Sequence, residues 1–158
     1  MITFVKRNFS IFIIILLSFW AVRPLFIDGF FPMHDDTQVA RVFEMGKMLK
    51  DGMFPVRWVP DLGYGFGYPI FNFYAPLAYY VGGFFTLLGL DALIATKIMM
   101  ILGVLLSGVF MYLLAREFWG EWGGLVSSAF YSFSPYHLLD IYIRGSVGEV
   151  WALAFFPA

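Results

Sequence analysis

The sequence contains no cysteine, which excludes disulfide bonds, thiolate nucleophiles and cysteine-type metal sites. It has only two histidines, so ligand number gives no support to a transition-metal centre. Charged residues make up 13% of the chain, about half the share found in soluble domains. The net charge is −1 and no basic stripe occurs, so nothing indicates a nucleic-acid partner.

Apolar side chains take the place of the missing charges. They make up 61% of the 158 residues, and aromatic residues alone make up 22%. Lipid accepts an apolar exterior that so few charges could not cover in water. We therefore expect an all-α fold of multi-pass transmembrane helices surrounded by membrane lipids. Because the sequence ends within an apolar run at 150–158, we interpret it as the N-terminal part of one membrane domain in a longer protein.

Long apolar stretches predict where the chain crosses the cytoplasmic membrane. Residues 9–27 form the first predicted span, and the basic residues Lys6 and Arg7 before it favour a cytoplasmic N-terminus. A signal peptide is the alternative for this stretch, although no small-residue cleavage site follows it. Later spans are predicted at 92–115, at 122–139 and from 150–158 onward.

The stretch at 74–90 is apolar but only about 17 residues long, the lower limit for a membrane span. If it crosses the membrane, the turn at 116–121 is external and the polar segment 140–149 is cytoplasmic. If it lies in the interface, that turn is cytoplasmic and the polar segments 28–73 and 140–149 share the external face. Too few basic residues are present for charge to decide between these topologies.

The polar segment 28–73 is expected to be an external loop that contains an amphipathic interfacial helix at 37–50. Asp35 or Asp36 is expected to cap this helix, and Gly52 to close it. The expected apolar face consists of Val39, Val42, Phe43, Gly46 and Leu49, and the expected polar face of Gln38, Arg41, Glu44 and Lys47. The rest of the segment is rich in Gly, Pro and aromatic residues, and we expect it to be ordered.

The first candidate functional group is the carboxylate pair Asp35 and Asp36, which follows the first predicted span. Repulsion between adjacent carboxylates suits one of them to accept a proton from a substrate hydroxyl. The alternative is a helix cap beside a solvated neighbour. Together with Glu149, the pair could also hold a divalent cation, although the spacing does not test this.

Arg144 and Glu149 form the second candidate, because polar residues flanked so closely by apolar segments usually serve a purpose. Arg144 is suited to bind a phosphate, and Glu149 to bind a ligand or pair with the arginine. The alternative is a loop before a helix start, with Glu149 at the positive terminus. In the aromatic loop, Tyr68 and Tyr74 could bind a sugar or an isoprenoid, but such residues more often anchor a protein in the interface.

The order of these features resembles the start of membrane glycosyltransferases with the GT-C fold. HDDTQVARVFEMGKMLKDGMFPVRW and YPIFNFYAPLAYYVGG are similar to the first external loop of protein mannosyltransferases and aminoarabinose transferases. MYLLAREFWGEWGGLVSSAFYSFSP is similar to a later segment of these enzymes. YIRGSVGEVWALAFFP looks closer to bacterial membrane proteins labelled 6-pyruvoyl-tetrahydropterin-synthase-related, which are akin to YfhO-type proteins.

The resemblance implies transfer of a sugar from a polyprenyl-phosphate donor to an extracytoplasmic acceptor, such as a cell-envelope glycan or lipid. Asp35 matches the acidic residue that activates the acceptor, and Asp36 the position after it. Arg144 would stabilise the departing phosphate, and Glu149 would orient Arg144 or a cation. The resemblance also favours the topology that places both polar segments outside. Alternatives are a transporter or flippase for a lipid-linked glycan and a non-catalytic scaffold. We expect the 158-residue chain to be inactive alone.

Overall fold

The computed structural model describes residues 2–158, with side chains described from Phe9 onward. Every regular element in this part of the chain is a helix, which confirms the all-α fold class. Strand-like pairing within the same residues is limited to an isolated antiparallel bridge between Val59 and Tyr68. Helices prevail because the apolar runs are too long and too continuous for the alternating pattern of a half-buried strand.

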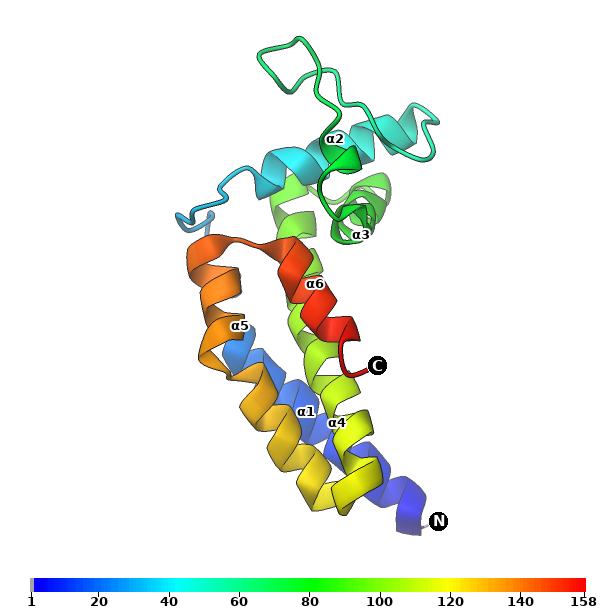
Figure 1. Ribbon diagram of the computed structural model, residues 1–158, viewed down its shortest axis with the longest axis vertical. Coiled ribbons are helices and arrows are strands. Elements are labelled where there is room, and N and C mark those ends of the chain that lie inside the picture. Colours follow the sequence, from blue (N-terminus) through cyan, green and yellow to red (C-terminus); the bar gives the residue numbers. More distant parts are fainter. Residues whose placement is uncertain (1) are drawn as a thin grey trace.

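Most helices follow one another with short connections, apart from residues 27–37 before α2 and the loop after α2. They are α1 (Ile2–Val22), η1 (Arg23–Phe26), α2 (Gln38–Lys50), η2 (Ile70–Asn72), α3 (Pro76–Leu87), α4 (Ala92–Ser132), α5 (Pro135–Leu139), η3 (Asp140–Arg144) and α6 (Val147–Phe155). α4 contains a sharp reversal at Gly120, whose φ of 69° and ψ of −172° lie outside the helical range. Its two arms therefore run in opposite directions (Figure 1).

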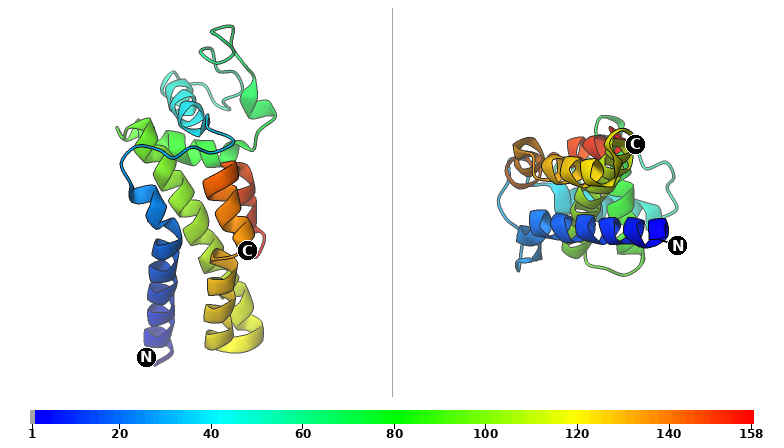
Figure 2. Two further views of the ribbon diagram at one scale, coloured as in Figure 1. Left: turned by 90° about the vertical axis from the view of Figure 1, so that its left-hand side faces the viewer. Right: turned by 90° about the horizontal axis from the view of Figure 1, so that it is seen from below.

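The molecule is an elongated helical bundle. α1 and the two arms of α4 run lengthwise, with the N-terminus and the reversal of α4 at one end (Figures 1 and 2). α2, α3 and the loop between them cover the other end. α6 packs against α4 and α3. The segment after α5 thus returns to the end of the bundle that carries α2.

Two stretches of the described chain are long and apolar enough to cross a membrane, judged by length and composition: Phe9–Phe26 and Ala92–Arg144. The second contains both arms of α4. α3 is much shorter, with 12 residues. A helix of that length extends about 18 Å, against roughly 30 Å for the hydrocarbon layer. In the side view of Figure 2, α3 lies across the end of the bundle.

Glycines allow the helices to pack closely at the core. A β-carbon on Gly46 of α2 would collide with Oγ1 of Thr86 on α3, and one on Gly103 of α4 would lie 2.9 Å from Cγ1 of Val150 on α6. Small residues at such crossings let helix backbones approach, which is how helices gain contact where hydrophobic burial offers little. The side chains buried around these crossings include Val42, Met45, Tyr79, Met99, Met100, Ile141 and Trp151.

The burial pattern of α2 corrects the expectation for the helix at 37–50. Gln38, Arg41 and Glu44 of the expected polar face are buried, whereas Phe43 of the expected apolar face is 53% exposed. Gln38 and Arg41 can be buried because distant residues satisfy their polar groups, as described below. Val42 and Gly46 of the expected apolar face are buried as expected. The sequence therefore predicted the helical period and part of the buried face, but not the polar side chains on that face.

The N-terminal end of α2 differs from the expectation, whereas its C-terminal end agrees with it. The N-cap is Thr37 and has no side-chain hydrogen bond, so neither Asp35 nor Asp36 caps the helix as expected. The carboxylate of Asp35 instead bonds elsewhere, which leaves it unable to cap. At the other end, Gly52 follows the C-cap residue with φ of 83°, the left-handed conformation that ends many helices.

The segment 140–149 is largely helical, which corrects the expectation of a polar loop. η3 is a π-turn that ends at Arg144, and α6 begins at Val147. Gly145 separates them with φ of 70°. A left-handed glycine ends one helix and lets the next start within two residues. The polar residues therefore lie on a joint between two helices.

Candidate functional site

Two polar segments far apart in sequence, 33–38 and 140–149, lie side by side at the end of the bundle that carries α2. The backbone N–H of His34 donates to the carbonyl of Ile143 over 2.8 Å, and that of Asp35 donates to the carbonyl of Arg144 over 2.9 Å. We call these two segments, with the tyrosines that bond to them, the polar junction. Its members come from both candidate groups identified in the sequence.

Gly145 makes this close approach possible. Its φ is +70°, and a β-carbon at this position would lie 2.9 Å from the carbonyl oxygen of Asp35 and would collide with Sδ of Met33. Glycine is the residue that accepts both the backbone conformation and the lack of space. The residue after Arg144 therefore determines how near the two segments can lie.

Asp35 lies on one side of the polar junction, with 28% of its side chain exposed. The hydroxyl of Tyr74 donates to Oδ2 of Asp35 over 3.2 Å, and Nη1 of Arg41 lies 3.7 Å from the same oxygen. The guanidinium of Arg41 also stacks over the ring of Tyr74 at 4.1 Å. Oδ1 lies 3.8 Å from Nδ1 of the exposed His34. These contacts fix the orientation of the carboxylate.

A buried network holds Arg41 in place. Its Nη1 donates to the hydroxyl of Tyr79 over 3.2 Å, and this hydroxyl donates to Oε1 of Gln38 over 2.6 Å. Nε2 of Gln38 then donates to the carbonyl of Gly145 over 2.6 Å. Burial alone would lower the pKa of Arg41, but its interactions with Tyr79 and Tyr74 raise that pKa above its ordinary value. A charged guanidinium thus links α2, α3 and the helix joint.

On the other side of the polar junction, two carboxylates hold Arg144. Its Nη1 donates to Oδ1 of Asp140 over 2.6 Å, and its two Nη atoms donate to the two oxygens of Glu149 over 2.8 and 2.6 Å. The hydroxyls of Tyr136 and Ser146 donate to Glu149 over 2.7 and 3.0 Å. Asp140 is fully buried, so its carboxylate depends on the arginine for compensation.

This cluster leaves little room for an additional anion at Arg144. The hydrogen bonds from Arg144, and then from Tyr136, lower the pKa of Glu149 to about 2. Glu149 is therefore ionised at neutral pH and occupies both ends of the guanidinium fork. A phosphate would have to displace it before binding there. The geometry suits Arg144 to holding the helix joint together more than to binding a free phosphate.

The structure brings Asp35, Tyr74, Arg144 and Glu149 to one end of the bundle, in two separate sets of contacts. In the described part of the chain, no hydrogen bond or ion pair joins the carboxylate of Asp35 to the guanidinium of Arg144. Their connection runs through the backbone. These backbone contacts position Asp35 and Arg144 relative to each other, but the two charged side chains do not form an ion pair with each other.

The remaining candidates lie outside these contacts. Asp36 is exposed, and Tyr68 pairs through its backbone with Val59 in the loop beyond α2. Among the residues whose side chains are described, no group of three or more histidines and carboxylates is placed to hold a metal ion. The divalent-cation site considered for Asp35, Asp36 and Glu149 is therefore not formed by those residues.

Several members of the polar junction were not among the candidates predicted from the sequence. Asp140 had a signal, because it precedes Arg144 by four residues, the spacing of an ion pair on a helix. Gln38 and Arg41 had none, because their partners Tyr79 and Gly145 lie 38 to 107 residues away. A periodic pattern cannot show that a polar side chain will meet a distant hydroxyl.

Comparison with known proteins gives one relative without an assigned activity. The chain is 28% identical over 159 residues to an uncharacterized protein from Lactococcus lactis subsp. cremoris (strain MG1363). The match covers 96% of the chain and 26% of that protein, so the chain spans about a quarter of its relative's length. No protein-family model matches the chain. No solved structure matches it either.

Proposed function

We propose that this chain is part of a multi-pass membrane glycosyltransferase that transfers a sugar from a polyprenyl-phosphate donor to an acceptor outside the cytoplasmic membrane. The observation that carries the proposal is the polar junction, where Asp35 lies against the Arg144–Glu149 segment. Asp35 is the residue that the resemblance to GT-C enzymes assigns to activation of the acceptor. The activity belongs to the whole protein, since the chain spans 26% of its relative.

In the proposed topology, α1 and both arms of α4 cross the membrane, and α3 lies at the outer surface. The shortness of α3 supports this arrangement, because its 12 residues fall well below the length of a span. The position of both polar segments at the end opposite the N-terminus supports it as well. The N-terminus and the reversal at Gly120 then face the cytoplasm, and residues 28–73 are external.

In the proposed mechanism, Asp35 accepts the proton of an acceptor hydroxyl while that oxygen attacks the anomeric carbon of the donor sugar. The bond from this carbon to the phosphate oxygen breaks, and polyprenyl phosphate leaves as an anion. Tyr74 and Arg41 hold Oδ2, so Oδ1 is the oxygen that receives the proton. Fixed orientation of a catalytic base contributes to rate because the reacting atoms start close to their final geometry.

Arg144 has a different role in this proposal from the one the resemblance implies. Because Asp140 and Glu149 occupy its guanidinium, we assign it to positioning. It stabilises the helix joint, and the joint holds the backbone of Asp35. The same ion pairing favours a second candidate function, a non-catalytic membrane scaffold, in which the polar junction serves only to connect helices.

Asp35→Asn in the full-length protein tests the proposal. Membranes containing the variant are assayed with a panel of polyprenyl-phosphate hexoses, and we expect transfer to fall by about 10²-fold or more. Asp51→Asn is the control, because Asp51 is an exposed carboxylate at the far end of α2. Full activity in a correctly folded Asp35→Asn protein would refute the catalytic role. Absence of transfer by the wild-type protein from every donor would favour the scaffold.

A further inference from the structure

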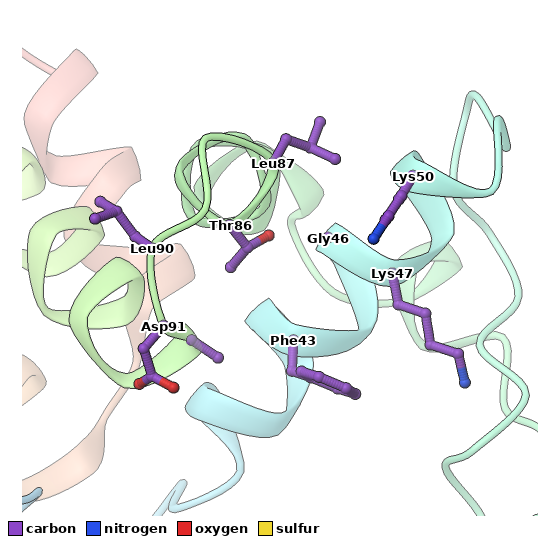
Figure 3. Close-up of a pocket in the computed structure, with 9 residues that line it drawn as sticks. Phe43, Gly46, Lys47, Lys50, Thr86, Leu87, Leu90 and Asp91 are labelled. Atoms are coloured by element: carbon purple, nitrogen blue, oxygen red, sulfur yellow. The ribbon is translucent and has the colours of Figure 1, made fainter.

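A cavity of about 380 Å³ lies between α2, α3 and the start of α4. Figure 3 shows the side chains that line it. They are Phe43, Gly46, Lys47, Lys50, Thr86, Leu87, Leu90, Asp91 and Ala92. None of these residues belongs to the polar junction. The volume lies within the range typical of small-molecule sites, and the proposed transfer reaction makes no use of it.

Part of the lining is apolar and open to the surroundings. Phe43, Leu87 and Leu90 are between 38% and 53% exposed, and Leu88 and Ile94, close to them in the sequence, are exposed as well. Ile94 lies in the first turn of α4, where the stretch long enough to cross a membrane begins. Exposed apolar side chains at the end of such a stretch suit contact with the upper part of an acyl chain.

The charged part of the lining carries both signs. Lys47 and Lys50 come from the last turn of α2, and Asp91 precedes α4 on the opposite wall (Figure 3). Lys47 is paired with Asp61 outside the cavity. In the part of the chain that the structure describes, Lys50 has no ion-pair partner. The cavity therefore offers a ligand the unpaired ammonium of Lys50 and the carboxylate of Asp91.

Asp91 keeps one carboxylate oxygen for a ligand. Its Oδ1 accepts from the backbone N–H of Leu93 over 2.8 Å and so caps α4. No described hydrogen bond engages Oδ2. A primary ammonium donates hydrogen bonds to a carboxylate oxygen, whereas a quaternary ammonium has no N–H to donate. The carboxylate of Asp91 therefore favours a head group with a primary ammonium over one with a quaternary ammonium, even where the two head groups carry the same net charge.

We propose that this cavity binds a zwitterionic phospholipid with an ethanolamine head group. The phosphate lies at Lys50, the primary ammonium at Asp91, and an acyl chain follows Phe43, Leu87 and Leu90. Charge complementarity selects this occupant, because an anionic lipid would leave Asp91 facing a phosphate without compensation. The inference rests on the membrane placement in the proposed function but not on the chemistry of Asp35.

The test measures retention of dimyristoyl phosphatidylethanolamine, phosphatidylglycerol and phosphatidylcholine by the full chain purified in detergent, using native mass spectrometry. We expect the ethanolamine lipid to be retained several-fold more than the other two. Asp91→Asn keeps the oxygen that caps α4 and removes the charge. It should lower retention of the ethanolamine lipid roughly fivefold and leave phosphatidylglycerol unchanged or improved. Lys50→Gln should weaken all three.

Matched controls are Glu117→Gln and Arg57→Gln, which remove exposed charges outside the cavity and should change nothing. Equal retention of the three lipids by the wild type would overturn the inference, as would a preference that survives Asp91→Asn. Competition by glycerophosphoethanolamine as strong as that by the lipid would overturn the acyl-chain contact. Asp35→Asn should retain the lipid normally, so this result and a failure of the transfer assay are distinguishable.

Discussion

The backbone amide of Asp35 donates to the carbonyl oxygen of Arg144 over 2.9 Å. Gln38, three residues after Asp35, reinforces this bond because its side-chain amide donates to the carbonyl oxygen of Gly145. A substitution in either polar segment therefore displaces the other through rigid backbone contacts. Loss of activity in an Arg144 variant would thus not identify Arg144 as a group that touches substrate.

Gly145→Ala should separate the two polar segments. The added β-carbon would collide with Met33 and crowd Asp35, at a position with φ of +70°. We expect a loss of about 1–3 kcal/mol in stability, measured by thermal unfolding in detergent. Gly148→Ala is the control, since its β-carbon would meet Ala75 at an ordinary 3.4 Å. Equal melting temperatures for the two variants would contradict the close approach.

Tyr79→Phe should destabilise the buried network. Removal of the hydroxyl leaves Arg41 and Gln38 without a shared partner, and both side chains are buried. An unsatisfied buried polar group costs about 1–3 kcal/mol, so chemical unfolding should begin at lower denaturant concentration. Tyr64→Phe serves as the control because Tyr64 is fully exposed. A Tyr79→Phe protein as stable as this control would contradict a stabilising role for the hydroxyl of Tyr79.

The Arg144–Glu149 pair should make stability depend on pH in the acid range. The pKa of Glu149 falls from 4.5 to about 2 through its hydrogen bonds, first from Arg144. A lowered folded-state pKa contributes stability above pH 4.5 and loses it as the pH falls toward 2. Solvent screening limits the effect to about 1 kcal/mol or less, because the Glu149 side chain is 41% exposed.

The measurement for this pair is the unfolding free energy of wild type and Glu149→Gln between pH 6 and pH 3. The gap between the two proteins should narrow as the pH falls. Glu117→Gln provides a comparison at the other end of the bundle, where the carboxylate is 70% exposed. A gap that stays constant would mean that Glu149 acts by packing and not by its charge.

Accessibility of introduced cysteines should test the membrane placement. The chain has no cysteine of its own, so a single cysteine reports without background. Cysteines in place of Ser146 and Thr37 should react with an impermeant reagent from outside the cell, and a cysteine in place of Glu117 only after the membrane is opened. Labelling of positions 146 and 37 from opposite sides would refute a shared face.

The helical class follows from composition and period, and α2 shows how far those signals reach. The helical periodicity of α2 and its C-terminal end near Gly52 are evident in the sequence. The polar part of its buried face is not evident, because Gln38 and Arg41 become buried only through Tyr79 on another helix. Similarly, Asp35 was expected to cap a helix, but Tyr74 and Arg41 hold its carboxylate in the folded chain.

Some residues of the candidate site could be predicted from the sequence, but the contacts between them could not. Asp35, Arg144 and Glu149 each stand out as charges within an apolar sequence. Arg144 is held by both Asp140 and Glu149 because of the turn that Gly145 produces. In the sequence alone, Arg144 could pair with either carboxylate or with both. The backbone bond between Asp35 and Arg144 depends on the return of the chain after Gly120, which local patterns do not encode.

The link between Gln38 and Gly145 also sets an order for biosynthesis. The two residues are separated by 107 positions, which a ribosome takes about 5–20 s to translate. During that delay Arg41 can already donate to Tyr79 on α3, only 38 positions ahead, but Gln38 lacks the carbonyl group of Gly145. The link between α2 and the helix joint therefore forms only after all of α4 has been synthesised, so the polar junction around Asp35 is completed late in the synthesis of this chain.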